Sequence, residues 1–344
     1  MPHQAGLGQS SGWWKLMLID PLRSYDLIGD VHGCGHSLEI LLERLGYRRQ
    51  GGVWRHPWRM ALFVGDIVDR GPRIREALHL VHDMVEAGQA LCAMGNHEYN
   101  LLGWSTEAPP ESGQRYVREH TVRNERLIHE TLTQFADHPG DWRAFLDWFY
   151  ELPLFIDAGR FRVVHACWDS SLIEPLRREY PDGVIDEPFL KASAVPDTFA
   201  HQVFERLLRG INMRLPHGMT LTGRDGLARE TFRSKFWADA PQTYADIVFQ
   251  PDALPEPVAQ MPISSVHRAE LPFYDADQPP LFVGHYWRQG QPSLIRSNLV
   301  CLDYSAVMFG KLVAYRLDQE TRLDPDKFAW VEVERPEAPH EYGN

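Results

Sequence analysis

The chain has 344 residues, of which 44% are hydrophobic and 24% charged, proportions that are ordinary for a globular protein in water. Its formal net charge of −12 argues against long nucleic acids and anionic membranes as partners, although it leaves room for a local basic pocket. No apolar run approaches roughly 20 residues, the N-terminus lacks the features of a signal peptide, and the four cysteines contain no C-x-x-C pair, so we expect a cytoplasmic protein without a membrane span or disulfides.

The first hundred residues alternate between short apolar runs and amphipathic segments. The apolar runs at 25–28, 60–64 and 90–94 predict three buried strands. The leucines between Ser37 and Gly46 recur at helical spacing and predict a helix that Ser37 caps and Gly46 ends. A second helix is predicted over 74–85. Such alternation predicts a largely parallel sheet, with ligands at the carboxyl ends of its strands.

The rest of the chain interrupts this pattern twice. Residues 104–150 are polar and helical, and the apolar runs at 161–166, 281–283, 299–302 and 312–315 predict further strands. Between them, residues 168–280 form a long insertion with one helix expected between Thr198 and Gly210. We therefore expect a single domain over residues 1–344, with cap segments at about 104–150 and 168–280.

Each of the first three predicted strands is followed by a cluster of glycines and metal-binding side chains. The clusters are Gly29-Asp30-Val31-His32-Gly33, Gly65-Asp66-Ile67-Val68-Asp69-Arg70-Gly71 and Gly95-Asn96-His97-Glu98. A lone Asp-x-His is a weak signal, because a solvated loop explains it in most proteins. Three such clusters, each directly after an apolar strand, predict a site with chemistry.

The spacing of these side chains suggests how they share metal ions. Asp30 and His32 are two residues apart, so at an extended strand end they would point to the same side and reach one ion. Asp66 has two carboxylate oxygens, which allows it to bridge two ions. Asn96 would give a neutral amide oxygen to the second ion.

Two further ligands for the second ion are expected among the 16 histidines. His165 ends a predicted strand, and His285 follows Val283-Gly284 in the same manner. The set of imidazole, carboxylate and amide groups without a thiolate suits two divalent ions. Manganese is the expected metal, with iron, zinc, cobalt or nickel as alternatives.

These motifs resemble those of the calcineurin-like metallophosphoesterase superfamily. The pattern G-D-x-H-G, G-D-x-V-D-R-G and G-N-H-E, followed by an isolated H and by G-H, resembles its phosphoprotein-phosphatase branch. The stretch 29–102 is similar to bacterial relatives that include diadenosine-tetraphosphate hydrolases and the phosphatase module of polynucleotide kinase–phosphatase. The resemblance implies an α/β fold, a two-sheet β sandwich flanked by helices, with a helical cap.

The resemblance also implies a division of ligands and a mechanism. Asp30, His32 and Asp66 would hold one ion, and the other would be held by Asp66, Asn96, His165 and His285. Two ions about 3.5–4 Å apart acidify a bridging water, which attacks phosphorus in line. His97 would protonate the leaving oxygen, and Asp69 would keep it oriented and charged. Arg70 would bind two phosphate oxygens, although an Asp69–Arg70 surface ion pair is the plainer alternative.

Three positions depart from the pattern of the relatives. Gly284-His285-Tyr286 stands where they commonly carry G-H-T, and Asp303-Tyr304-Ser305 where they carry D-T-G. Trp287 occupies the place of the second histidine of the nuclease-type members, which argues against double-strand-break nuclease activity. We therefore expect a groove of different shape beside His285.

Substrate choice is expected to depend on the cap. Arg224, in the turn-like Gly223-Arg224-Asp225-Gly226, is the candidate for a second phosphate-binding arginine, with a merely solvated surface as the alternative. The expected enzyme is a phosphatase for phosphomonoesters, on phosphoproteins or small molecules such as nucleotides. The alternative is a dinucleoside polyphosphate (diadenosine tetraphosphate) hydrolase with the same site. A catalytically silent metal-binding protein would be expected to have lost a ligand, His97 or Asp69, and none is lost.

Overall fold

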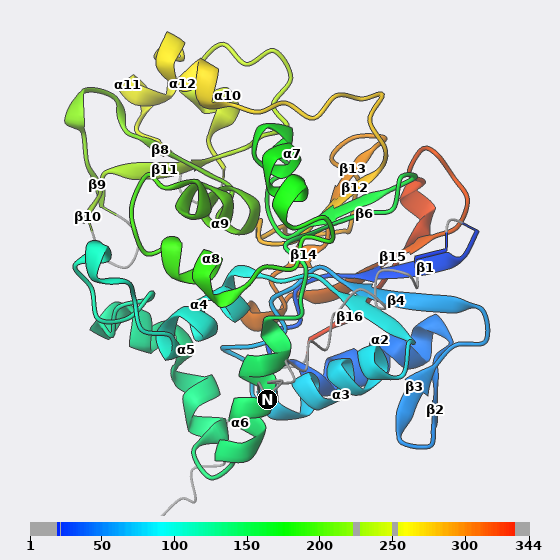
Figure 1. Ribbon diagram of the computed structural model, residues 1–344. Helices are drawn as coiled ribbons and strands as arrows, with labels where there is room; N and C mark the ends of the chain where they lie inside the picture. The colour runs from blue at the N-terminus through cyan, green and yellow to red at the C-terminus, as the bar shows by residue number, and fades with distance from the viewer. Residues whose placement is uncertain (1–18, 21, 223–227, 250–253, 334–344) are drawn as a thin grey trace, which may run out of the picture.

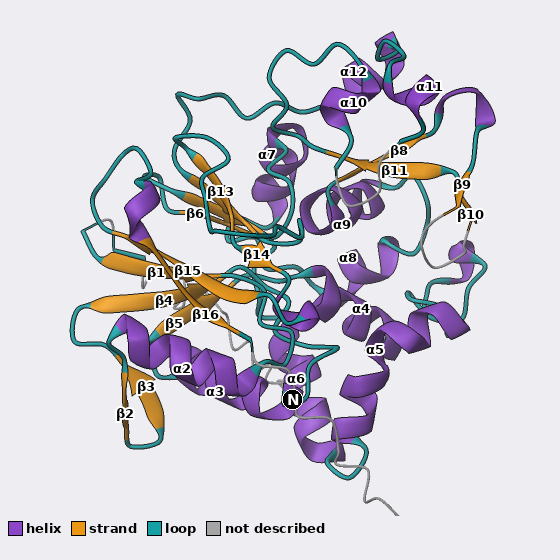
Figure 2. Cartoon of the chain, turned by 180° about the vertical axis from the view of Figure 1, so that it is seen from behind, coloured by secondary structure: helices purple, strands orange, loops and turns teal. Residues whose placement is uncertain are grey.

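Two β-sheets pack face to face in the computed structural model, with helices on their outer faces (Figures 1 and 2). The structure describes residues 19–20, 22–222, 228–249 and 254–333. The first sheet has the strand order β14-β15-β1-β4-β5, and β16 pairs with β15. Its strands are β1 (Ser24–Ile28), β4 (Arg59–Phe63), β5 (Ala90–Cys92), β14 (Asp303–Tyr304), β15 (Lys311–Leu317) and β16 (Phe328–Glu332).

The second sheet has the order β13-β12-β7-β6. Its strands are β6 (Phe155–Asp157), β7 (Arg162–Val164), β12 (Leu281–Val283) and β13 (Leu299–Cys301). In the first sheet β1, β4 and β5 are parallel, and in the second β7, β12 and β13 are parallel. Three two-stranded ribbons complete the strands: β2 (Arg48–Gln50) with β3 (Val53–Arg55), β8 (Ile211–Arg214) with β11 (Thr231–Ser234), and β9 (Leu221–Thr222) with β10 (Ala228–Arg229).

The helices cover the sheets and build the insertion. They are α2 (Gly35–Leu45), α3 (Ile74–Glu86), α4 (Asn96–Ser105), α5 (Val122–Phe135), α6 (Pro139–Phe149), α7 (Ser170–Glu179), α8 (Glu187–Ala192), α9 (Phe199–Arg209), α10 (Tyr244–Ile247), α11 (Glu256–Ala259) and α12 (Ser265–Glu270). Short 3₁₀ turns lie at Pro110–Ser112, Pro216–Gly218, Ala306–Met308 and Pro325–Lys327. Among the described residues no helix is both long and apolar enough to cross a membrane.

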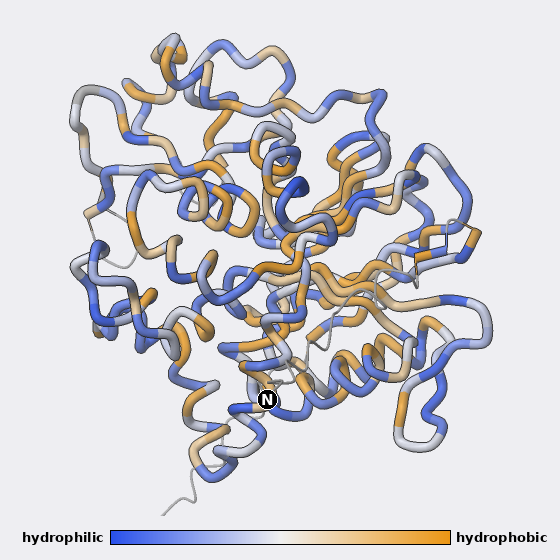
Figure 3. Tube along the Cα trace, viewed as in Figure 1, coloured by the Kyte–Doolittle hydropathy of each residue, from blue (hydrophilic) through white to orange (hydrophobic). Residues whose placement is uncertain are grey.

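Alternation along each strand divides the core into two layers. Tyr25 and Leu27 of β1 point into the space between the sheets, where they join Leu62 of β4 and Phe282 of β12. The opposite face of the same sheet, which includes Ile28, packs instead against the leucines of α2 and α3. Hydrophobic residues accordingly gather along the central strands in Figure 3. Each fully buried large apolar side chain contributes about 1.5–3 kcal/mol to this packing.

The structure confirms the predicted two-sheet sandwich flanked by helices. Two local expectations were wrong. The first helix begins at Gly35, because the chain enters it directly from a turn at Gly33, so Ser37 lies inside the helix and does not cap it. The insertion between β7 and β12 contains the expected helix as α9, capped by Thr198, but it also contains the β8–β11 ribbon. It is therefore a mixed and not a purely helical insertion.

Candidate active site

Five strand ends from the two sheets bring the expected metal ligands together. Asp30, Asp66 and Asn96 follow β1, β4 and β5, whose parallel pairing places their carboxyl ends at one edge of the first sheet. His165 directly follows β7 and His285 lies two residues after β12, the neighbouring parallel strand of the second sheet. All six expected ligands are buried, which excludes solvated loops as the explanation of the motifs.

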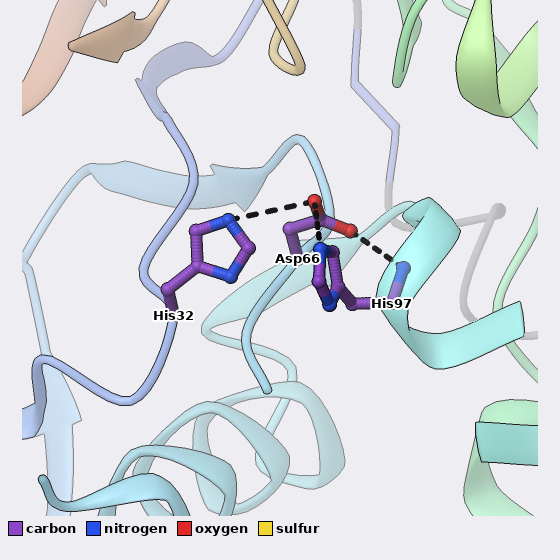
Figure 4. Close-up of side chains that lie close together, drawn as sticks. All are labelled: His32, Asp66 and His97. Atoms are coloured by element: carbon purple, nitrogen blue, oxygen red, sulfur yellow. Dashed lines mark hydrogen bonds and ion pairs between the residues drawn. The ribbon is translucent and has the colours of Figure 1, made fainter. Parts of the chain in front are cut away.

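The carboxylate of Asp66 lies at the centre of the site. Its Oδ2 is 3.2 Å from Nε2 of His165, 3.6 Å from Nε2 of His32 and 3.9 Å from Nε2 of His97. Figure 4 shows His32 and His97 approaching Asp66 from the loop after β1 and from the start of α4. Two groups of side chains are compact enough to hold an ion each, namely His32 with Asp66 and His97, and Asp66 with His165 and His285. Asp66 belongs to both groups, as a bridging ligand would.

The remaining expected ligands surround the second group. The side-chain amide of Asn96 lies 2.7 Å from Nδ1 of His285 and 3.2 Å from Nε2 of His165. Asp30 Oδ2 accepts a hydrogen bond from the backbone nitrogen of His285 at 3.0 Å. Asp30 Oδ1 and His285 Nε2 are buried without a hydrogen-bond partner among the described residues. Buried polar atoms without partners are costly in a folded protein, and a bound cation would satisfy them.

Backbone carbonyls orient two of the imidazole rings. Nδ1 of His32 lies 2.9 Å from the carbonyl oxygen of Val68, and Nδ1 of His165 lies 2.9 Å from that of Val64. Each Nδ1–H can therefore donate to a carbonyl, which directs Nε2, the atom available to bind a metal ion, toward Asp66. This is the usual way in which a protein fixes the tautomer of a metal-binding histidine. The donor atoms thus fit divalent metal ions.

Burial and charge shift the pKa values of these groups strongly. Burial alone would lower the pKa of His165, but the negative charge of Asp66 overcomes it and raises the pKa to about 10. Burial would raise the pKa of Asp66, but the His165 and His97 rings hold it well below its usual range. Burial, and next the charge of Arg233, hold the pKa of His285 well below its usual range. The site therefore concentrates negative charge at Asp66 when no metal is bound.

His97 and Asp69 form a buried pair beside this centre. Nδ1 of His97 lies 2.5 Å from Oδ2 of Asp69, and the hydroxyl of Thr131 on α5 donates to the other carboxylate oxygen. Burial lowers the pKa of His97 to about 3 and raises that of Asp69 well above its usual range. Burial therefore disfavours the charged form of both side chains in the metal-free site. Asp69 holds Nδ1 of His97, which leaves the other ring nitrogen, Nε2, on the side of Asp66 at 3.9 Å from its Oδ2.

Glu98 holds two of the site loops through their backbone nitrogens. Its Oε2 accepts from Asp66 and Gly95, both at 2.9 Å, and its Oε1 accepts from Ile67 at 2.8 Å and Val68 at 3.3 Å. Burial and the nearby charge of Asp66 raise the pKa of Glu98 to about 7. The motif contained this residue, but nothing in the motif indicated that its partners would be four backbone N–H groups.

Backbone strain concentrates at the site. His32, Asp66, Asp69, Arg70 and His285 all have positive φ, a conformation that is uncommon for residues other than glycine. The segment after β1 is accordingly a turn, so the expectation that Asp30 and His32 project from an extended strand end is wrong, although both reach the site. The turn brings His32 to one side of Asp66 and leaves Asp30 on the side of His165 and His285.

Two guanidinium groups that influence the histidines of the site electrostatically lack an anionic partner among the described residues. Within that part of the chain, neither Arg70 nor Arg233 of β11 has a side-chain hydrogen bond or ion pair, and Nε of Arg233 is buried and unsatisfied. Arg209, by contrast, pairs with Glu205 at 2.5 Å. Arg224, the arginine expected in this role, lies outside the described residues. The sequence signal for Arg233 was too weak to single it out, because it is one of several arginines in the insertion.

A family model and several curated proteins match parts of this chain. Residues 25–215 match the family model described as calcineurin-like phosphoesterase. The bis(5'-nucleosyl)-tetraphosphatase PrpE of Halalkalibacterium halodurans is 46% identical over 74 residues, 21% of this chain and 30% of that protein. The PrpE of Anoxybacillus flavithermus is 42% identical over 150 residues, 41% of this chain and 56% of that protein. The chain thus spans about half or less of the length of these curated relatives.

Matches among solved structures have low sequence identity and TM-scores below 0.5. A Saccharomyces cerevisiae protein serine/threonine phosphatase with similarity to human phosphatase PP5 has a TM-score of 0.49 at 15% identity, covering 96% of this chain and 89% of that one. A cold-active protein-tyrosine phosphatase of a Shewanella species has a TM-score of 0.46 at 15% identity, covering 88% of this chain and 81% of that one.

Proposed function

Because the chain belongs to the calcineurin-like phosphoesterase family, we propose that it is a phosphatase that hydrolyses phosphomonoesters at the Asp66 centre. Membership makes the protein a metal-dependent phosphoester hydrolase. The observation that carries the finer proposal is the pair of ligand groups that share Asp66, together with two guanidinium groups that influence the site histidines and lack an anionic partner among the described residues. A phosphoryl group is the ligand that such an arrangement of cations and metal ligands fits.

Each side chain of the site has a proposed role. Asp30, His32, Asp66, Asn96, His165 and His285 would hold two divalent ions, for which we propose manganese. Ions bound there lower the pKa of a water molecule and neutralise charge on the phosphoryl oxygens. Arg70 and Arg233 would bind those oxygens through their N–H groups. Nε2–H of His97, held by Asp69, would protonate the departing oxygen. We propose that residues 1–344 form one domain, with the cap segments 104–150 and 168–280 selecting the group attached to the phosphate.

The second candidate is the hydrolysis of dinucleoside polyphosphates. It is favoured by the tetraphosphatase names of the relatives that are 42–46% identical. Those matches cover only 30% and 56% of the two relatives. The same ligands, arginines and proton donor would then act on a phosphoanhydride, and the cap would accommodate a nucleoside at each end.

One set of assays separates these candidates. Purified protein with manganese is expected to hydrolyse para-nitrophenyl phosphate, and failure with several divalent metals demonstrably bound would contradict the phosphomonoesterase. Diadenosine tetraphosphate is offered in parallel, with products resolved by chromatography; turnover of this substrate alone would establish the second candidate. His97→Ala should lower turnover by roughly 10²–10⁴-fold while metal content stays unchanged. An unaltered rate would remove His97 from the role of proton donor.

A further inference from the structure

Two aromatic residues come directly after the ligand His285 and take opposite directions. Tyr286 is fully buried, whereas Trp287 is 41% exposed. Tyr286 points into the insertion, where its ring meets three aromatic rings of residues 236–249. Trp287 points to the rim of the site, where its ring meets Arg70. Two consecutive residues therefore contact two different parts of the molecule, the insertion and Arg70.

Tyr286 is enclosed by what we call the aromatic box, formed by Phe236, Trp237 and Phe249. The ring centroids of these residues lie 6.0, 4.7 and 5.1 Å from that of Tyr286. Gly210, at the end of α9, closes the box, because a Cβ at that position would lie 2.4 Å from the tyrosine hydroxyl. Such tilted and edge-on contacts stabilise aromatic clusters beyond the burial of their area. The insertion is thus packed around a residue of the core domain.

The aromatic box is directly connected to Arg233. The backbone nitrogen of Phe249 donates to the carbonyl oxygen of Arg233 at 2.8 Å, and Phe236 lies three residues further along the chain. The guanidinium group of Arg233 lies close enough to His285 and Tyr286 to perturb both electrostatically. Tyr286 therefore packs against Phe249, which is hydrogen-bonded to the backbone of Arg233, and the Nε of that arginine is buried.

Trp287 has the corresponding relation to Arg70. The guanidinium carbon of Arg70 lies 5.5 Å from the centroid of the indole ring, within the range of a cation–π contact. A carboxylate partner would occupy the N–H groups of the arginine, but an aromatic face leaves them free to donate in the guanidinium plane. Since Arg70 has no ion pair among the described residues, the indole is the contact that can orient it.

We propose that Tyr286 and Trp287 are positioning residues, each for one arginine: Tyr286 for Arg233 and Trp287 for Arg70. The inference rests on the proposed function, because it presupposes that both arginines bind the phosphoryl group. It explains why the two residues after His285 are both large aromatics here. The two arginines belong to different segments of the chain, and the two residues after His285 would fix the positions of both relative to the metal ligands.

Two double-mutant cycles on the manganese-loaded enzyme test the pairing, with para-nitrophenyl phosphate as substrate and inorganic phosphate as competitive inhibitor. Arg70→Ala and Arg233→Ala should each lower kcat/KM by about 10²–10³-fold. Tyr286→Ala should cost about tenfold in the parent enzyme but less than about twofold when Arg233 is already alanine, and Trp287→Ala should behave likewise with Arg70. The crossed pairs, Tyr286 with Arg70 and Trp287 with Arg233, should be additive within about twofold.

Control variants distinguish a positioning role from a loss of folding or of metal binding. Tyr286→Phe and Trp287→Phe keep an aromatic ring and should recover most of the loss, both in kcat/KM and in the inhibition constant for phosphate. Trp58→Ala removes a 70%-exposed tryptophan at the opposite end of β4 and should leave kcat/KM as in the parent. Manganese content and thermal unfolding are measured for every variant, so that loss of metal or fold is recognised.

The outcomes separate failure of the proposed function from failure of the positioning roles. If Arg70→Ala and Arg233→Ala leave both turnover and phosphate inhibition unchanged, the proposed phosphate-binding role of the arginines fails. If the arginine variants are impaired but all four pairs are additive, or the crossed pairs couple as strongly as the matched pairs, the positioning roles are overturned. Coupling confined to the matched pairs, with recovery by phenylalanine, supports the inference.

Discussion

Replacing Glu98 with glutamine tests whether one buried carboxylate organises the loops of the site. The wild-type side chain accepts four backbone N–H groups, two on each oxygen, at 2.8–3.3 Å. An amide nitrogen cannot accept, so in either orientation Glu98→Gln leaves two buried N–H groups facing another donor. Each unsatisfied group costs about 1–3 kcal/mol, so we expect a loss of about 2–6 kcal/mol in the free energy of unfolding. This is a large fraction of the roughly 5–15 kcal/mol typical of a folded domain.

The assay is urea unfolding at about pH 8, above the pKa of about 7 that burial gives Glu98, so that the wild-type group is ionised. Because the loop that follows Asp66 loses a backbone acceptor in either orientation of the amide, we also expect weaker manganese binding by titration calorimetry. Glu111→Gln makes the same chemical change at an exposed position and should have little effect on either measurement. A Glu98→Gln protein that unfolds within about 1 kcal/mol of the parent and binds manganese equally well would refute this role of Glu98.

Four further predictions have defined outcomes. The pKa of His165 is raised to about 10 in the metal-free site, so metal uptake at about pH 8 should release about one proton. Calorimetry in buffers of different ionisation enthalpy measures this release, and a release of no protons would contradict the prediction. Because that proton is held only by the folded state, the stability of the metal-free protein should receive a contribution from His165 that falls by about 1.4 kcal/mol per pH unit from pH 6.5 to about 10. Arg59→Met leaves the fully buried Asp26 short of its partner at 2.9 Å and should cost about 3–5 kcal/mol in urea unfolding, whereas a loss below about 1 kcal/mol would show that Arg316 compensates. Thr131→Val removes the hydroxyl that holds Asp69 and should lower turnover about tenfold with metal content unchanged; an equal rate would make the contact dispensable.

The sequence predicted the parts of the site that depend on local pattern. Asp30, Asp66 and Asn96 each come after an apolar strand, and parallel strands bring the residues after their carboxyl ends to one edge of a sheet. His165 and His285 were harder to single out, since each is one residue beside a short strand. The pairing of β7 with β12 brings them together, and that pairing spans more than a hundred residues of intervening chain.

The parts that could not be predicted depend on contacts between distant segments. Thr131 reaches Asp69 from the middle of α5, and nothing in the spacing of that helix distinguishes it from other polar positions. Arg233 is one arginine among several in the insertion, and its place near His285 depends on the packing of the aromatic box. The opposite pKa shifts of His97 and Asp69 result from burial, which motifs do not reveal.

The insertion begins and ends at neighbouring strands, which bears on how the protein can diversify. The chain departs after β7 and returns at β12, which pairs with β7 in parallel through Arg162 with Leu281 and Val163 with Phe282. The length and shape of the intervening segment therefore place no demand on the sheet that carries the ligands. A different segment could be grafted between these strands without moving the metal ligands, provided that it offers Tyr286 a pocket and supplies a replacement for Arg233.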